Sequence, residues 1–288
     1  MAEALDGIIS SMKYKIFYIN LDRVPERRAF MNNEFQKVGL DGAIRFSAVD
    51  AKVKGALSDV GFRQGIGDRW ALPKSAIACF ESHRAVWKLA MDLGVDAALI
   101  MEDDLVMSSE LPPALETLFE AANNFDVVKL DHSPALVRFG PNVRLNGIDL
   151  RSIQNVTTSA GAYVVSRTGI EKLLARSEEY GDTLDDFLYR PQAGWQMFQI
   201  FPAVSAQLVH IEKRAEQQPD INLRTSERER DPQINESNLS RGPAWFRIRK
   251  ELRRLGSRLL WRLWGKNALQ RKGGYYGSVA IAEDLINL

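Results

Sequence analysis

Disulfide bonds and membrane-spanning helices are the first features that this sequence lacks. Its 288 residues include one cysteine, Cys79, so no disulfide can form within the chain and the cysteine content gives no sign of secretion. No apolar run approaches the roughly 20 residues of a transmembrane helix. Residues 1–12 have neither a basic start nor a long apolar run, so we expect no signal peptide there. The composition, 45% hydrophobic and 26% charged, is typical of a globular protein.

The net charge is close to zero, at +1, but the charges are distributed unevenly. Residues 241–288 carry eleven Lys and Arg against three Asp and Glu, whereas the first 240 residues carry 27 and 34. Segments of opposite charge usually have different partners. Residues 215–240 are polar with little to bury. We therefore expect a catalytic domain at 13–214, a polar linker or flap at 215–240 and a basic amphipathic tail at 241–288.

The sequence AALIMEDD at residues 97–104 is the most informative stretch. Five apolar residues without polar alternation predict a strand that is covered on both faces. Three carboxylates follow, Glu102, Asp103 and Asp104, and they repel one another unless a positive charge lies among them. In an extended chain Glu102 and Asp104 share one side, where they would suit Mg²⁺ or Mn²⁺ together with substrate phosphates. The alternative is a solvated acidic loop without a function.

The N-terminal part of the chain predicts a β-α-β unit. Residues 15–21 and 43–49 are expected strands, and the helix between them begins at Pro25 and ends at Gly39. In doubly wound sheets, polar residues beyond the strand ends face the ligand. The residues at these positions are Asn20, Arg23, Arg27 and Asp50. We interpret them as candidate nucleotide contacts; for an arginine on the helix, the alternative is a solvated surface.

A helix expected at residues 74–93 carries a histidine on its apolar face. Phe80, His83 and Trp87 recur at helical spacing, which turns the imidazole inward. Two roles fit such a histidine. It is either a satisfied core group or a donor to a diphosphate oxygen.

Two more polar pairs follow later elements. Asp131 and His132 come directly after an expected strand at 126–130 and are secondary site candidates, whereas residues 133–155 read as irregular. Asp185 and Asp186 precede a short apolar turn. One of these two carboxylates would accept the proton of an incoming hydroxyl group.

The two acidic sites together indicate a reaction class. A metal at Glu102 and Asp104 would stabilise the charge on a diphosphate leaving group, while Asp185 or Asp186 would serve as the base. This division of labour predicts transfer of a group from a nucleoside diphosphate donor to an alcohol. Hydrolysis would use the same residues with water as the acceptor.

Six short segments between residues 14 and 210 carry a family resemblance. They are INLDRVPERR at 19–28, AVD at 48–50, IACFESH at 77–83, ALIMEDD at 98–104, GAYVVS at 161–166 and LDDFL at 184–188. Each is a weak signal alone, but six in this order are specific. By these segments the sequence resembles glycosyltransferase family 25, bacterial lipopolysaccharide and lipooligosaccharide enzymes that are often β-1,4-galactosyltransferases.

The resemblance implies an α/β, GT-A-like Rossmann-type fold with a central mixed, mostly parallel sheet. It implies metal-dependent transfer of a sugar, galactose in the first instance, from a UDP-sugar to a surface-glycan hydroxyl, with inversion at the anomeric carbon. The metal, Mn²⁺ or Mg²⁺, would be held by Glu102 and Asp104. The nucleotide side would comprise Asn20, Arg23, Arg27, Asp50, His83 and Asp103. The alternatives are another donor sugar such as glucose, or a non-catalytic glycan-binding module.

The basic tail predicts an amphipathic helix within residues 241–272. Its apolar residues, which recur every three or four positions, are Trp245, Ile248, Leu252, Leu255, Leu259 and Leu263. With Lys and Arg on the remaining faces, this pattern is typical of a helix in an anionic membrane interface. Docking on the protein's own acidic body is the alternative. Nucleic acid is not expected as the partner, because contact with its phosphate backbone would not bury the apolar stripe. We expect a cytoplasmic protein, peripheral on the inner face of the cytoplasmic membrane, that acts on a lipid-linked glycan.

Overall fold

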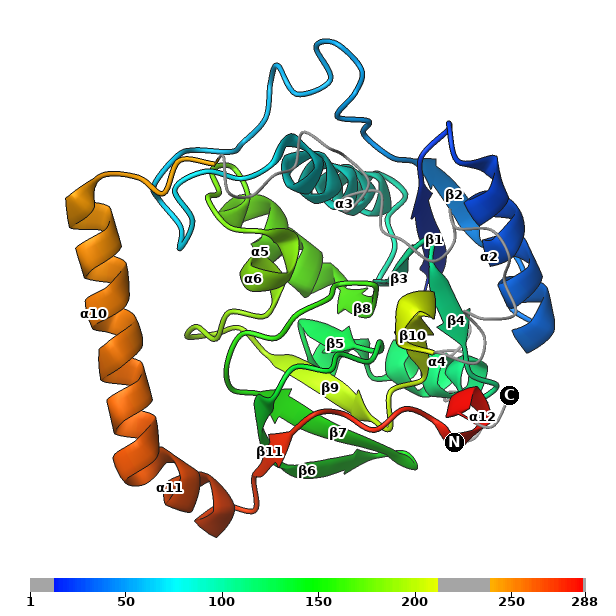
Figure 1. The fold of residues 1–288 in the computed structure, drawn as a ribbon. Helices are drawn as coiled ribbons and strands as arrows, with labels where there is room; N and C mark the ends of the chain where they lie inside the picture. The colour runs from blue at the N-terminus through cyan, green and yellow to red at the C-terminus, as the bar shows by residue number, and fades with distance from the viewer. Residues whose placement is uncertain (1–12, 212–238, 287–288) are drawn as a thin grey trace.

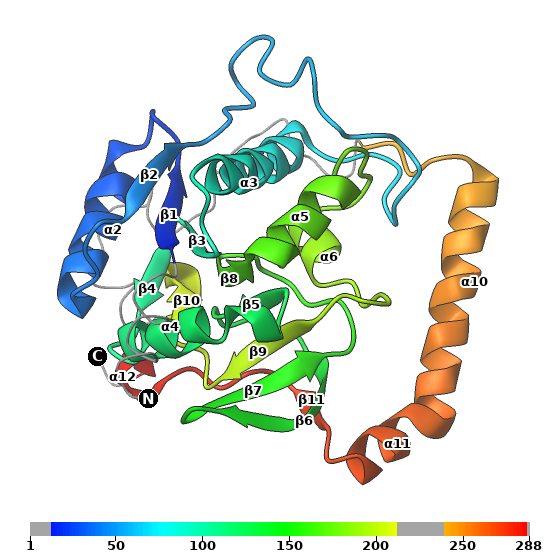
Figure 2. The same ribbon diagram turned by 180° about the vertical axis from the view of Figure 1, so that it is seen from behind.

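The computed structural model describes residues 13–211 and 239–286 and places helices on both sides of one large sheet (Figures 1 and 2). The expectations for residues 1–12 and for most of the linker at 215–240 therefore lie outside the described residues. None of the described helices is both long and apolar enough to cross a membrane.

Nine of the described strands form the central sheet. They are β1 (Tyr14–Asn20), β2 (Ile44–Ser47), β3 (Ala97–Glu102), β5 (Val127–Lys129), β6 (Val137–Leu145), β7 (Ile148–Ile153), β8 (Ala162–Ser166), β9 (Met197–Phe201) and β11 (Tyr275–Gly277). Their spatial order is β11-β6-β7-β9-β5-β8-β3-β1-β2. The pairings point β1, β2, β3, β5, β6 and β9 one way and β7, β8 and β11 the other. The expected α/β fold with a mixed, mostly parallel sheet is confirmed.

The helices that cover the sheet belong to two layers. One layer contains α2 (Pro25–Val38) and α4 (Leu111–Glu120), and the other contains α3 (Lys74–Asp92), α5 (Arg167–Arg176) and α6 (Leu184–Leu188). Strand β3 shows the arrangement most clearly, because Leu99 and Met101 pack in the first layer's core while Ala98 and Ile100 pack in the second. The strand is therefore buried on both faces, as its uninterrupted apolar sequence predicts.

The ends of α2 follow from its sequence. Pro25 occupies the first turn, where its missing N–H costs no hydrogen bond, and Gly39 ends the helix in the left-handed conformation with φ of 69°. The return of the chain to β2 completes the expected β-α-β unit, since β1 pairs in parallel with both β2 and β3. The carboxyl ends of β1 and β3 consequently lie side by side.

The expectation that residues 133–155 are irregular is wrong, because this segment contains the hairpin of β6 and β7. The two strands pair antiparallel around Asn146 and Gly147, which have φ of 43° and 99°. Asn-Gly supplies the two positive φ angles that a tight hairpin turn requires. The dipeptide was the available sequence signal, and the Pro, Gly and Asn residues scattered through the segment concealed it.

Beyond the linker the chain forms a long helix and then returns to the body. The elements are α10 (Ala244–Leu260), a π-helical turn (Trp261–Gly265) and α11 (Lys266–Arg271). Then β11 pairs with β6 at the edge of the sheet, and α12 (Glu283–Ile286) joins the core through Leu285. The Asp284 carboxylate of α12 accepts hydrogen bonds from Ser108 and Ser109 at 2.8–3.0 Å. The amphipathic part of the tail therefore ends near residue 271.

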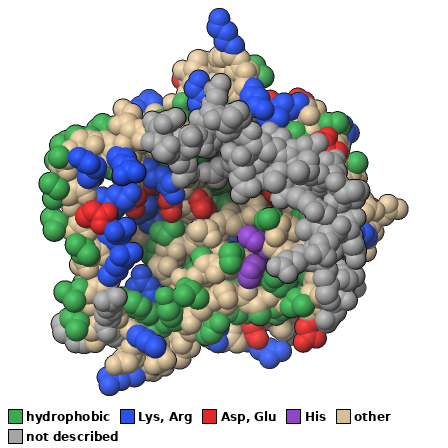
Figure 3. All heavy atoms as spheres, in the orientation of Figure 1, with side chains coloured by type: hydrophobic (Ala, Val, Ile, Leu, Met, Phe, Trp, Pro, Cys, Tyr) green, Lys and Arg blue, Asp and Glu red, His purple; other side chains and the backbone are tan. Residues whose placement is uncertain are grey.

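Helix α10 contacts the body near its N-terminal end and leaves its apolar stripe exposed. Phe246 is buried against Trp70, with ring centroids 5.3 Å apart, and Arg253 forms an ion pair with Asp68. In Figure 3 hydrophobic side chains line the outer edge of this helix and basic side chains lie nearer the body. The exposed stripe, 55–65% accessible, comprises Trp245, Ile248, Leu252, Leu255, Leu259, Leu260 and Leu263. Apart from Trp245, whose ring centroid lies 6.2 Å from that of Trp70, the stripe is thus not docked on the described body.

Candidate active site

A cavity of about 450 Å³ opens beside the carboxyl ends of β1 and β3. Its walls come from the start of α3, the loop after β2, the loop before β8, the start of α6 and the turn after β10 (Ser205–Gln207). Eight of the expected site residues line it, namely Arg23, Arg27, Asp50, His83, Glu102, Asp103, Asp104 and Asp185. The topology therefore brings together side chains that are up to 162 residues apart in the sequence.

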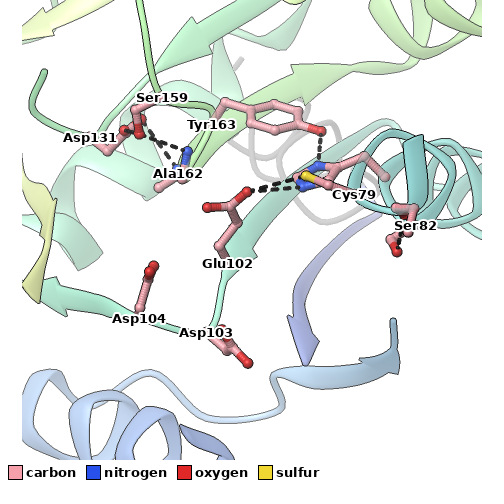
Figure 4. A network of polar contacts seen from close by, with 12 residues as sticks. Cys79, Ser82, Glu102, Asp103, Asp104, Asp131, Ser159, Ala162 and Tyr163 are labelled. Carbon is pink, nitrogen blue, oxygen red and sulfur yellow. Dashed lines mark hydrogen bonds and ion pairs between the residues drawn. The ribbon is translucent and has the colours of Figure 1, made fainter. Parts of the chain in front are cut away.

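The three carboxylates that end β3 divide into an anchored one and a facing pair. Asp103 is buried and points away from its two neighbours (Figure 4). It accepts hydrogen bonds from Asn20 Nδ2 and Arg27 Nη1, each at 2.7 Å. Asn20 also donates to the Val24 carbonyl, so its amide holds the strand end together and is not among the residues that line the cavity.

Glu102 and Asp104 face the same part of the cavity. The amide nitrogen of Gln207 lies 3.4 Å from an oxygen of Glu102 and 3.4 Å from both oxygens of Asp104. The Arg27 guanidinium lies 3.7 Å from Asp104. Burial, together with the charges of Glu102 and Asp103, raises the pKa of Asp104 to about 7, although Arg27 opposes this shift.

This donor set fits a hard divalent cation. Within the described residues Glu102, Asp103 and Asp104 bring three carboxylates together, and the Arg27 guanidinium lies 2.7 Å from Asp103 and 3.7 Å from Asp104. An N–H donor already lies between Glu102 and Asp104, a position that also suits a cation with oxygen ligands. Glu102 and Asp104 are therefore the residues that would hold Mn²⁺ or Mg²⁺.

Basic groups border the other side of the cavity. Arg23 donates to Asp50 at 2.7 Å, and both side chains line the cavity together with Lys52. Burial alone would raise the pKa of Asp50, but the Lys52 backbone N–H and the Arg23 guanidinium outweigh it and lower that pKa. Asp50 therefore stays ionised and orients Arg23 along the wall of the cavity.

His83 is held from within the core and faces the cavity. Its Nδ1 lies 2.8 Å from the Tyr163 hydroxyl, which also accepts a hydrogen bond from Trp87 Nε1 at 3.0 Å. Its Nε2 lies 3.8 Å from Glu102, and Cys79 Sγ lies 3.6 Å from the same carboxylate oxygen (Figure 4). One ring nitrogen of His83 is thus satisfied in the core and the other points at the cavity, while donation to a diphosphate oxygen stays a prediction.

The acidic pair at α6 divides in the same way. Asp185 lines the cavity, whereas Asp186 is not among its lining residues and lies 3.6 Å from Arg69. Burial, followed by the charge of Asp185, raises the pKa of Asp186. Two consecutive residues in a helical turn point in different directions, so the structure brings only Asp185 to the other site residues.

Asp131 and His132 do not line the cavity. Asp131 is fully buried and accepts hydrogen bonds from Lys129 Nζ at 2.6 Å, Ser159 Oγ at 2.5 Å and the Ala162 backbone at 3.2 Å. Burial lowers the pKa of Lys129, which Asp131 opposes. Asp131 therefore fixes the loop before β8, which forms one wall of the cavity. His132 donates from Nδ1 to the Val279 carbonyl at 2.8 Å.

Several cavity residues were not predicted from the sequence. Gln207 is the last residue of β10, His210 follows that strand, and Cys79 lies one helical turn before His83. The argument that selected Asp50, a polar residue just beyond a strand, applies to His210 but not to Gln207, which lies within its strand. Cys79 could have been found from its spacing of four residues to His83, which places both on one helix face.

Comparisons with known proteins show what the chain is similar to. The family model of glycosyltransferase family 25 (LPS biosynthesis protein) matches residues 13–188. A glycosyltransferase 25 family member of Drosophila pseudoobscura pseudoobscura is 39% identical over 97 residues, which are 31% of this chain and 15% of that protein. Lacto-N-neotetraose biosynthesis glycosyltransferase LgtE of Neisseria meningitidis serogroup B (strain ATCC BAA-335 / MC58) is 26% identical, covering 52% of this chain and 58% of its own length.

A third relative bears on whether such chains are active. The probable inactive glycosyltransferase 25 family member 3 of Bos taurus is 26% identical over 178 residues, which are 56% of this chain and 28% of that protein. The chain thus spans between 15% and 58% of the length of these three relatives.

Proposed function

The chain belongs to glycosyltransferase family 25, and from that premise we propose that it transfers a sugar from a UDP-sugar to a hydroxyl of lipopolysaccharide or another surface glycan. Galactose is the proposed sugar. The observation that carries the proposal is the facing pair Glu102 and Asp104 in a cavity that also presents Arg23, Lys52 and Asp185.

The donor diphosphate would lie between the acidic and basic walls of the cavity. Glu102 and Asp104 would hold Mn²⁺ or Mg²⁺, which supplies positive charge to the diphosphate as it departs. Arg23, ordered by Asp50, would donate to a phosphate oxygen, and His83 Nε2 would do so in its protonated form. Asp103 would act behind them, because it accepts hydrogen bonds from both Asn20 and Arg27 and so fixes the end of β3.

Asp185 is the proposed base. Its carboxylate would accept the proton of the acceptor hydroxyl as the hydroxyl oxygen bonds to the anomeric carbon and the bond to the diphosphate breaks. Attack on the face opposite the leaving diphosphate inverts the anomeric configuration. The structure favours Asp185 over Asp186 because only Asp185 lines the cavity.

We further propose that α10 holds the protein on an anionic membrane surface, where a lipid-linked acceptor would be found. Six large apolar side chains of α10, and Leu263 in the π-helical turn that follows, are more than half exposed. The neighbouring Arg247, Arg249, Lys250, Arg254 and Arg258 would face lipid phosphates. This would make the protein peripheral on the cytoplasmic face of the membrane.

Release of UDP from a panel of UDP-sugars in the presence of Mn²⁺ tests the transferase proposal. We expect turnover with one donor, UDP-galactose, and its loss in Asp104→Ala. Asp41→Ala is the matched control, because Asp41 is an exposed carboxylate outside the cavity. Turnover with UDP-glucose and not with UDP-galactose would assign glucose as the donor sugar. Binding of glycan without UDP release from any donor would support the non-catalytic module, which the probable inactive relative makes the competing function.

A further inference from the structure

Cys79, His83 and Glu102 converge on one point of the cavity wall. Cys79 and His83 are one turn apart on α3, and Glu102 ends β3 beside them. One oxygen of Glu102 lies 3.6 Å from the Cys79 sulfur and 3.8 Å from His83 Nε2, and the three ligand atoms lie within 4.8 Å of one another. Figure 4 shows the side chains of Cys79 and Glu102 directed toward each other.

The imidazole of His83 provides an independent indication of a ligand. Its side chain is 1% exposed, yet Nε2 makes no hydrogen bond within the described residues. Buried polar atoms are nearly always paired, so an unpaired one that faces a cavity needs an explanation. The hydrogen bond between Nδ1 and Tyr163 fixes the ring in the way that metal-bound histidines are usually fixed by a second partner.

The chemistry of this set differs from that of Glu102 and Asp104. Thiolate, imidazole and carboxylate together favour Zn²⁺, whereas Mg²⁺ and Mn²⁺ favour oxygen alone. Zinc bonds of about 2.0–2.3 Å place tetrahedral ligand atoms about 3.3–3.8 Å apart. Two of the three separations already have this value. Three protein ligands leave the fourth position open to the cavity.

We propose that Cys79, His83 and Glu102 form a binding site for a borderline-soft divalent cation, with Zn²⁺ as the preferred ion. When Nε2 binds the ion, Nδ1 carries the ring proton and donates a hydrogen bond to the Tyr163 hydroxyl. Glu102 is shared with the pair that would hold Mn²⁺. Zn²⁺ therefore draws Glu102 away from Asp104 and inhibits the transferase, a consequence that rests on the proposed function, whereas the binding itself does not.

Titration of the metal-stripped full chain with Co²⁺ tests the site. Because Cys79 is the only cysteine of the chain, a thiolate-to-cobalt charge-transfer band identifies it as a ligand. We expect this band together with the visible bands of tetrahedral Co²⁺, and their displacement by Zn²⁺. Cys79→Ser should abolish the charge-transfer band and lower Zn²⁺ affinity by about tenfold or more. His83→Gln should also weaken Zn²⁺ binding. Thermal melts of each variant confirm that it folds.

Asp104→Asn is the matched control, because Asp104 belongs to the neighbouring pair and not to this site. It should keep the cobalt bands even if it loses every response to Mn²⁺, so that failure of the proposed function and failure of this site are distinguishable. Absence of the charge-transfer band at saturating Co²⁺ overturns the site. Zn²⁺ affinity in Cys79→Ser equal to that of the unaltered chain overturns it as well.

Discussion

The amide nitrogen of Gln207 lies 3.4 Å from both carboxylate oxygens of Asp104. Asp104 nevertheless has a pKa of about 7, because burial and the adjacent carboxylates outweigh the two donors that it has in Gln207 and Arg27. Within the described residues, the donors that face Asp104 are one neutral amide and a guanidinium that it shares with Asp103. A divalent cation would add positive charge there.

The stabilisation that a cation gives should therefore depend on pH. The pKa of Asp104 rises from 3.8 to about 7 on folding, so the native chain binds the extra proton between these values and its stability falls as the pH rises through that window. Mn²⁺ competes with this proton. We expect Mn²⁺ to raise the melting temperature strongly at pH 8 and weakly at pH 5.5, as measured by scanning calorimetry. In Asp104→Asn the Mn²⁺-induced rise in melting temperature should be the same at the two pH values. A rise in this variant that depends on pH as much as in the unaltered chain would contradict the assignment.

The buried ion pair of Arg27 and Asp103 should matter far more for stability than the exposed one of Arg23 and Asp50. Arg27 is 6% exposed and Arg23 is 35% exposed. Arg27→Met leaves Asp103 buried without its charged partner and should lower the free energy of unfolding by about 3–5 kcal/mol. Arg23→Met, the matched control, should cost less than about 1 kcal/mol. Urea denaturation measures both. Similar losses in the two variants would show that the Arg27 pair does not anchor β3.

The adjacent residues Asp185 and Asp186 allow a comparison of position at constant chemistry. Asp185→Asn should lower kcat by about 10²–10⁴-fold with little change in KM for the donor, because general-base catalysis contributes about that much. Asp186→Asn should leave kcat within a few fold, since its carboxylate faces Arg69. Steady-state kinetics with a saturating donor distinguishes them. The reverse order of effects would assign the base to Asp186.

The exposed stripe of α10 predicts binding to anionic vesicles. Leu252 is 65% exposed at the middle of the stripe, and Leu252→Glu places a charge where acyl chains would be. We expect flotation with phosphatidylglycerol-containing vesicles to be lost in this variant. Ser257→Glu adds the same charge on the opposite face, because five residues turn a helix by about 140°, and should retain binding. Equal flotation of both variants, or none of the unaltered chain, would count against the membrane proposal.

Site residues could be predicted from the sequence where a single short segment contains both a strand and the polar residue at its end. Asn20, Asp50 and Glu102 were found in this way, because the edge of a parallel sheet brings such residues together whatever the loops do. Gln207 and Cys79 depend on how β10 and α3 approach β3. That approach is set by packing between distant segments, which a single sequence does not reveal.

The directions of the carboxylate side chains could be predicted only where the local backbone alone determines them. The extended-chain argument correctly placed Glu102 and Asp104 together and Asp103 apart, although Asp103 and Asp104 are in a turn beyond β3. It could not separate Asp185 from Asp186, because the direction of a side chain in a single helical turn depends on what that turn packs against. The burial of Asp131 likewise depends on packing between separate segments, since its partners Lys129 and Ser159 lie in β5 and in the loop before β8.

The segment from α10 to β11 is attached to the body at both ends, through Phe246 against Trp70 and through β11 against β6. A segment fastened twice cannot sweep freely as a single tether would. On a membrane that binds the stripe, the cavity would consequently be held at a fixed height and tilt relative to the membrane surface. The length of glycan that separates the lipid from the reacting hydroxyl would then be selected by the geometry of the scaffold, even before a sugar is recognised.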